Sequence, residues 1–290
     1  MTTSAIAASS LRKPFEFATP GPIAATVEVA GAQVRVTASD RTDTVVLVEP
    51  IDEANRSDVK VADRTKVEFA DGRLSIKTTV SGRKNGSVAI TIALPAGSDL
   101  ATYLAYSAVH ADGSFGECEL HMASGQVQLD RVDALQASIA SGEVTIGHVS
   151  GRADIDGGAI AMRIGEVEGT VGCSTSGGQV WIGHACADLD LSSSSCDFEI
   201  DCADGSVTAT QAGGAIRIGR MTHGRAKLIS GSGDIEVGIS EGAAACIDAN
   251  SDRGAVHNFI SQGDAGPSDD KVMVHARTRH GDIIIQRAAS

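Results

Sequence analysis

The sequence has 290 residues, with 33 glycines, six prolines and few aromatic side chains. Its ordinary hydrophobic content excludes a disordered chain and allows a sizeable core. The formal net charge is −13, and without a run of Lys or Arg such a surface repels phosphate backbones, which excludes nucleic acid as a partner.

Residues 1–14 are rich in Ala and Ser and show no strand pattern, so we expect a disordered N-terminus. A basic start followed by a continuous apolar block is absent from this region, which argues against a signal peptide. No segment approaches the ~20 apolar residues that span a bilayer. We therefore expect a cytoplasmic protein without membrane insertion, whose six cysteines are reduced thiols.

Residues 15–116 alternate between apolar and polar positions without a fixed period, and Gly31, Gly72 and Gly86 mark turns. Short alternating runs of this kind are typical of antiparallel strands. We expect an N-terminal β-rich cap, with a loop or a single helical turn at 52–65 and a transition to another architecture at 95–116.

Residues 117–260 contain an internal repeat. An apolar residue followed by Gly or Asp recurs every 18 residues through the centre of this region, with one step of 17 before and one of 19 after. The repeated residues are Leu129, Ile146, Ile164, Ile182, Ile200, Ile218 and Val237. Such a period indicates a stack of structural repeats, each too small to bury its own apolar side chains.

Each repeat has the alternation of a strand with one buried face. Apolar residues also stand two positions before the repeated one, and polar or mixed residues lie between the two columns, so that Phe198 and Ile200 should point inward and Glu199 outward. A glycine four positions before the repeated residue marks a turn, and Ile160 and Cys196 interrupt that column. The pattern predicts an all-β fold, a β-solenoid with rungs of about 18 residues.

Residues 261–290 begin with a polar insert at 261–270. Two alternating runs follow, at 272–276 and 281–285, and we expect them to close the C-terminal end of the solenoid. Coverage is needed because an open terminal rung exposes unpaired backbone groups.

The units Ser141-Gly142-Glu143-Val144, Ser232-Gly233-Asp234-Ile235 and Gly281-Asp282-Ile283 resemble the Ser/Gly-Gly-x-Val/Ile repeats of the bacterial putative-adhesin domain family of unknown function. An N-terminal strand region that leads into such repeats also fits. The resemblance implies a β-solenoid with a β-rich cap, and it brings no catalytic residues.

One outward column has chemically active residues on four consecutive rungs: His148, Glu166, His184 and Cys202. These side chains can bind Zn²⁺, but a straight ladder at about 5 Å per rung brings only two or three of them to one ion. The alternative is a solvated ladder in which Glu166 pairs with either imidazole. We favour this alternative and expect no metal or other cofactor.

Two further outward columns bear on function. Arg163, Trp181 and Arg217 share a column, and exposed Trp and Arg side chains often anchor interfaces; the alternative is that Trp181 folds flat on its neighbours.

Asp154 and Asp190 are two rungs apart, roughly 9.6 Å, at the edge of the range of separations seen between the two carboxylates of inverting glycosidases.

The leading hypothesis is a non-enzymatic scaffold or interaction protein that binds an unknown protein or carbohydrate through a face or an end of the solenoid. One alternative is a carbohydrate-active enzyme on the same fold. Another is end-to-end self-association, as in bactofilin polymers.

Overall fold

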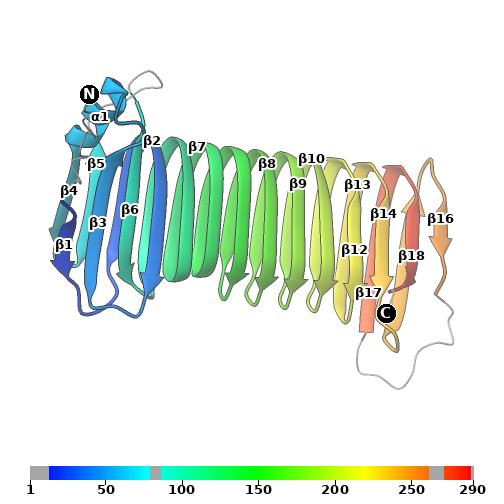
Figure 1. Ribbon diagram of the computed structural model, residues 1–290. Coiled ribbons are helices and arrows are strands. Elements are labelled where there is room, and N and C mark those ends of the chain that lie inside the picture. Colours follow the sequence, from blue (N-terminus) through cyan, green and yellow to red (C-terminus); the bar gives the residue numbers. More distant parts are fainter. Residues whose placement is uncertain (1–12, 79–85, 261–270, 289–290) are drawn as a thin grey trace, which may run out of the picture.

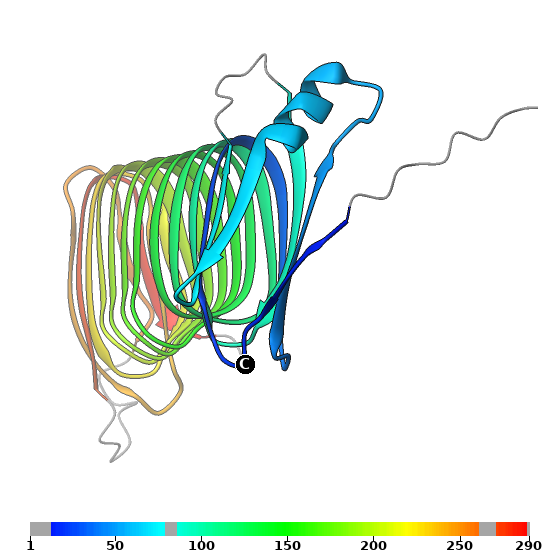
Figure 2. The same ribbon diagram turned by 90° about the vertical axis from the view of Figure 1, so that its left-hand side faces the viewer.

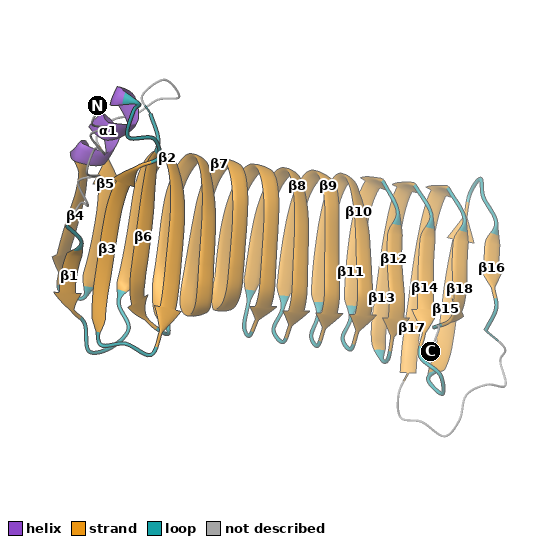
Figure 3. Ribbon diagram, in the orientation of Figure 1, coloured by secondary structure: helices purple, strands orange, loops and turns teal. Residues whose placement is uncertain are grey.

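The structure is a computed structural model that describes residues 13–78, 86–260 and 271–288. Flat coils of β-strand stack into a rod, with a cap of strands and a helix at one end (Figures 1 and 3). The expected disordered segment 1–14 lies almost wholly outside the described residues, and the polar insert 261–270 lies entirely outside them.

The cap and first coil comprise β1 (Phe15–Ala18), β2 (Ala24–Ser39), β3 (Asp43–Pro50), α1 (Arg56–Arg64), β4 (Thr65–Ala70), β5 (Arg73–Thr78) and β6 (Val88–Pro95). The body comprises β7 (Ser98–Val149), β8 (Ala153–Val167), β9 (Val171–Ala185), β10 (Leu189–Ala203), β11 (Val207–Gly213) and β12 (Ile216–Met221). The C-terminal end comprises β13 (Gly224–Ser232), β14 (Ile235–Ile239), β15 (Ala244–Ser251), β16 (Val256–Asn258), β17 (Lys271–His280) and β18 (Ile283–Arg287).

The coils of the body pair in parallel with an offset of 18 residues, as the repeat predicts. Val144 lies beside Met162, which lies beside Val180, and the same column continues to Phe198 and Ile216. All five side chains are buried, as are those two positions further along each strand. Burial of one such side chain contributes about 1.5–3 kcal/mol, so the continuous core is the main source of stability. The predicted β-solenoid is confirmed.

The glycine column marks a corner that a side chain would block. Gly142 and Gly178 have φ of 138° and 114°, a region that L side chains rarely adopt. A Cβ on Gly142 would also lie 2.0 Å from the carbonyl oxygen of Gly125 on the preceding coil. Ile160 and Cys196 interrupt the column without positive φ, and both are buried.

At the N-terminal end the cap is antiparallel, as expected, but it is smaller than the sequence suggests. β3 pairs antiparallel with β6 and β1, and β4 pairs antiparallel with β5. In contrast, β2 pairs in parallel with β5, β6 and β7 and is a coil of the solenoid. The boundary expected between residues 116 and 117 falls inside β7, because alternation alone does not separate a parallel coil from an antiparallel strand.

The segment expected to be a loop or a single turn at 52–65 contains the nine-residue helix α1. The Asn55 side chain accepts a hydrogen bond from the Ser57 backbone amide and caps the first turn. Val61 and Ala62 are buried against the cap. α1 lies over one edge of the coils in the view along the rod (Figure 2).

At the C-terminal end the coils stack out of chain order. β17 and β18 pair with β13 and β14 on one side and with β15 and β16 on the other. The two expected closing strands therefore lie inside the stack, and β15 and β16 form the terminal coil (Figure 1). Their composition explains the order, since Val272, Val274, Ile283 and Ile285 are almost fully buried and need a coil on each side.

No helix within the described ranges is long and apolar enough to cross a membrane.

We predict that Phe198→Ala lowers the free energy of unfolding by about 3–5 kcal/mol, because Phe198 is among the largest fully buried side chains and its loss leaves a cavity. Glu199→Ala, one residue along β10, should change it by only about 0.5 kcal/mol. Urea unfolding followed by circular dichroism measures both. Equal losses would contradict the inward and outward assignment.

Candidate functional site

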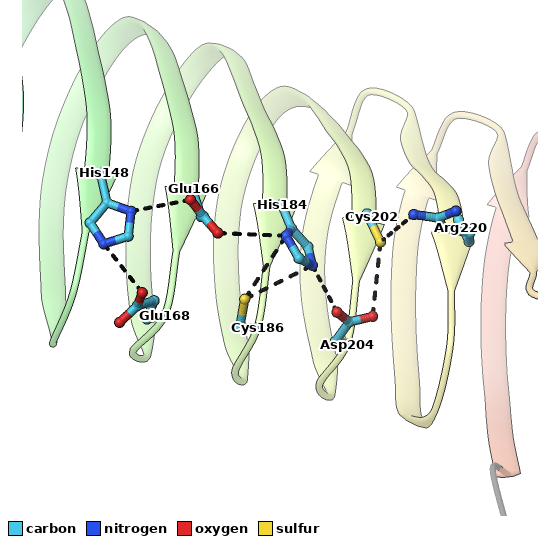
Figure 4. Close-up of polar contacts among 8 residues, drawn as sticks. All are labelled: His148, Glu166, Glu168, His184, Cys186, Cys202, Asp204 and Arg220. Atoms are coloured by element: carbon cyan, nitrogen blue, oxygen red, sulfur yellow. Dashed lines mark hydrogen bonds and ion pairs between the residues drawn. The ribbon is translucent and has the colours of Figure 1, made fainter.

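Reactive side chains gather along one corner of the rod, where β8, β9 and β10 end. Val167, Ala185 and Ala203 point into the core there and are fully buried, so the residues on both sides of each point outward. Two adjacent outward rows result. The corner cluster is His148, Glu166, Glu168, His184, Cys186, Cys202, Asp204 and Arg220 (Figure 4).

The first row is the column that the sequence predicts. His148, Glu166, His184 and Cys202 occupy matching positions on successive coils, and Arg220 follows Cys202. Glu166 lies between the two imidazoles: its Oε2 is 3.3 Å from Nδ1 of His148 and its Oε1 is 3.9 Å from Nδ1 of His184. Glu166, which we expected to pair with either imidazole, contacts both.

The second row lies two residues further along each coil and has Glu168, Cys186 and Asp204. Oδ2 of Asp204 is 2.7 Å from Nε2 of His184, and the Thr222 hydroxyl donates to Oδ1 of Asp204 over 2.7 Å. Burial raises the pKa of Asp204, but the hydrogen bonds from His184 and Thr222 together outweigh burial and bring the pKa below its usual value. Asp204 is therefore a fixed carboxylate at neutral pH.

Two thiols flank His184. The exposed Cys186 has its Sγ 3.9 Å from Nε2 of His184. Cys202 is nearly buried, with its Sγ 3.4 Å from Nη2 of Arg220 and 3.9 Å from Oδ1 of Asp204. Partial burial, and after it the charges of Glu166, Asp204 and Glu168, raise the pKa of Cys186, so this thiol is protonated at neutral pH.

Sequence reasoning found one row of this site and missed the other. The repeat does contain the signal for the second row. The fourth residue after Ile164, Ile182 and Ile200 is Glu168, Cys186 and Asp204, respectively. Ligand atoms of Glu166, His184 and Cys186 all lie within 4.8 Å of one another, as do those of His184, Cys202 and Asp204.

The predicted interaction surface of Arg163, Trp181 and Arg217 is occupied by contacts within the rod. Trp181 is half-buried, donates from Nε1 to Oδ1 of Asp201 over 3.2 Å and lies 5.9 Å from the Arg163 guanidinium. Nε of Arg217 is 3.0 Å from Oε2 of Glu236. These contacts favour the alternative in which Trp181 lies flat across its neighbours, and the interface at this column stays a prediction.

The carboxylates considered for glycoside chemistry, Asp154 and Asp190, lie on either side of Gly172 in one column. Arg152 donates two hydrogen bonds to Asp154, so this carboxylate already has a cationic partner.

Residues 25–286 match the family model described as Toastrack DUF4097. The chain belongs to this family. The match spans nearly the whole solenoid and its cap, and it confirms the membership in a domain family of unknown function that the Gly-x-Val units suggest.

Several solved structures resemble this Toastrack chain. A putative adhesin from Parabacteroides distasonis ATCC 8503 has 12% identity and a TM-score of 0.44, with 93% of this chain and 95% of that chain covered. A putative adhesin from Bacteroides fragilis NCTC 9343 has 12% identity and a TM-score of 0.37, with 94% and 96% covered. A putative lipid binding protein from Parabacteroides distasonis ATCC 8503 has 12% identity and a TM-score of 0.40, with 96% of each covered. No curated protein matches the sequence.

We predict that Asp204→Asn, in metal-free buffer, lowers the free energy of unfolding at neutral pH by at most about 1 kcal/mol, since partly exposed ion pairs contribute little. The lowered pKa of folded Asp204 means that its stabilisation is complete above the unfolded pKa of about 3.9. It is lost as the pH falls through the folded value. Urea unfolding at several pH values should show the two proteins converging in acid; a constant gap would contradict the assignment.

Proposed function

We propose that this Toastrack chain is a non-enzymatic interaction protein that binds through the C-terminal end of its rod, and that its partner there is a second copy of the same chain. The observation that carries the proposal is the terminal coil of β15 and β16. Each strand pairs on one side only, with β17 and β18 respectively, among the strands that the structure describes.

The apolar interior reaches solvent at this end. Ala245, Ile247 and Ala249 of β15 are only half-buried, whereas Val274 and Ala276 on the adjacent coil are buried. Just beyond β16, the Phe259 side chain is 65% exposed, and its ring stacks on His257 at 6.3 Å. Exposed apolar patches of this kind mark interaction sites.

The charges on the strand edges favour the C-terminal end over the N-terminal end. Edge strands that avoid pairing usually have charged residues, Lys above all, and β4 at the N-terminal end has Lys66 and Glu68 exposed. β15 has one charged residue, Asp248, whose Oδ2 is 2.7 Å from Nη2 of Arg277. The free edge of β15 therefore meets little charge repulsion from a partner.

A second copy suits this edge because antiparallel pairing of β15 with itself is self-complementary. A two-fold contact of this type closes at a dimer, whereas contact between the C-terminal end and the N-terminal end continues into a filament. The size of the assembly therefore distinguishes the two-fold dimer from the bactofilin-like polymer, which is the alternative considered from the sequence.

We predict a concentration-dependent monomer–dimer equilibrium for the whole chain, measured by sedimentation velocity. Phe259→Ala should raise the dimer dissociation constant by at least about tenfold, since the loss of an aromatic interface anchor costs about 2 kcal/mol or more. Phe15→Ala is the matched control, because Phe15 is exposed at the opposite end, and it should leave the equilibrium unchanged.

Other outcomes would overturn the proposal. Mass that rises beyond a dimer, with equal sensitivity to Phe15→Ala and Phe259→Ala, would indicate head-to-tail stacking. A monomer at all concentrations would show that no second copy binds this end.

A further inference from the structure

Two stacked pairs of side chains form a compact donor set in the corner cluster. His184 and Cys186 flank the buried Ala185 at the end of β9, and Cys202 and Asp204 flank the buried Ala203 at the end of β10. His184 lies directly beside Cys202 in the parallel register. The two pairs therefore point outward from the core on neighbouring coils, about 4.8 Å apart, although Cys202 is itself nearly buried.

From this arrangement we infer a zinc site formed by His184, Cys202 and Asp204, with Cys186 as the fourth donor. Imidazole, thiolate and carboxylate are the ligands that Zn²⁺ takes in tetrahedral sites. The thiolates favour Zn²⁺ over the hard cations Mg²⁺ and Ca²⁺.

The distances suit one ion. Tetrahedral bonds of about 2.0–2.3 Å place ligand atoms roughly 3.3–3.8 Å apart. Nε2 of His184 is 2.7 Å from Oδ2 of Asp204 and 3.9 Å from Sγ of Cys186, and Sγ of Cys202 is 3.9 Å from Oδ1 of Asp204. Ligand atoms of His184, Cys202 and Asp204 all lie within 4.8 Å of one another. A closed site needs a short separation of the imidazole from the carboxylate and a rotation of the Cys186 side chain toward the other three donors.

The surrounding residues hold these donors as the second shell of a zinc site does. A metal-bound histidine commonly has a carboxylate at its other ring nitrogen; Glu166 is on that side of His184, with Oε1 3.9 Å from Nδ1, an ion-pair distance that is too long for a hydrogen bond. The Thr222 hydroxyl binds Oδ1 of Asp204 and leaves Oδ2 directed at His184. Figure 4 shows Asp204 and Cys202 on one side of His184 and Cys186 on the other.

The charges around the site are mixed. The two thiols lose their protons when a metal binds, so two thiolates and one carboxylate bring three negative charges to a divalent ion. Arg220, 3.4 Å from Sγ of Cys202, adds a positive charge, and Glu166, 3.9 Å from His184, adds a negative one. His184, Asp204 and Cys186 are partly exposed or exposed, so an ion reaches the site from solvent without opening of the core.

The test uses the whole chain, reduced and stripped of metal, titrated with Co²⁺ as an optical probe and then with Zn²⁺. We expect one Co²⁺ per chain, a sulfur-to-cobalt charge-transfer band, and loss of that band when Zn²⁺ displaces the probe. Cys202→Ser and His184→Ala should each weaken Zn²⁺ binding by more than about tenfold, the scale of losing even a supporting residue. Cys186→Ser should weaken the band without abolishing it.

His121→Ala is the matched control. His121 pairs with a carboxylate, with Nε2 2.8 Å from Oε1 of Glu119, and it lies outside the corner cluster, so the affinity should stay unchanged. Circular dichroism checks that each variant is folded. Because Cys202 is nearly buried, Asp204→Asn serves as a second variant on the surface, with the same expected loss.

Absence of the charge-transfer band with Co²⁺, or a band that persists unchanged in both cysteine variants, would overturn the site. Neither result bears on dimerisation, since the corner cluster and the terminal coil share no residues.

Discussion

Register between stacked coils is the constraint on which the rest of this structure depends. A single coil presents Phe198 or Ile200 to its neighbours and cannot bury them alone, so stability comes from the contact between coils. Parallel hydrogen bonding fixes those contacts residue against residue. The outward side chains take the same register, and this is why residues 18 positions apart, such as Glu166 and His184, meet at the surface.

The sequence predicts the middle of the rod well because two independent periodicities coincide there. The 18-residue repeat gives the neighbour of each residue, and the alternation within a strand gives its face. Neither periodicity gives the order of coils at the ends. β2 alternates like a cap strand yet lies in the solenoid, and the strands that continue the Gly-x-Ile pattern at 281–285 lie one coil inside the terminal one.

The candidate site follows the same division. The row that contains His184 can be predicted from the sequence because it lies within the strands, where the alternation of buried and exposed residues is regular. Cys186 and Asp204 lie just beyond the strand ends, where alternation usually stops, and only the buried alanines before them show that it continues. The contacts of Trp181 could not be predicted in the same way. Its position in the repeat fixes the direction of its Cβ, but the ring is long enough to reach Asp201 on the next coil.

The order of coils also sets how the rod assembles. In the body each coil pairs with the segment 18 residues away, so each coil can form against the coil that precedes it in the chain. The N-terminal coil β2 instead lies between β7 and the pair β5 and β6, and the coil of β17 and β18 must enter between two segments made before it. Contacts of this kind close longer loops and form more slowly. The terminal coil, and with it the edge of β15, is therefore complete only after β17 and β18 have been made and inserted.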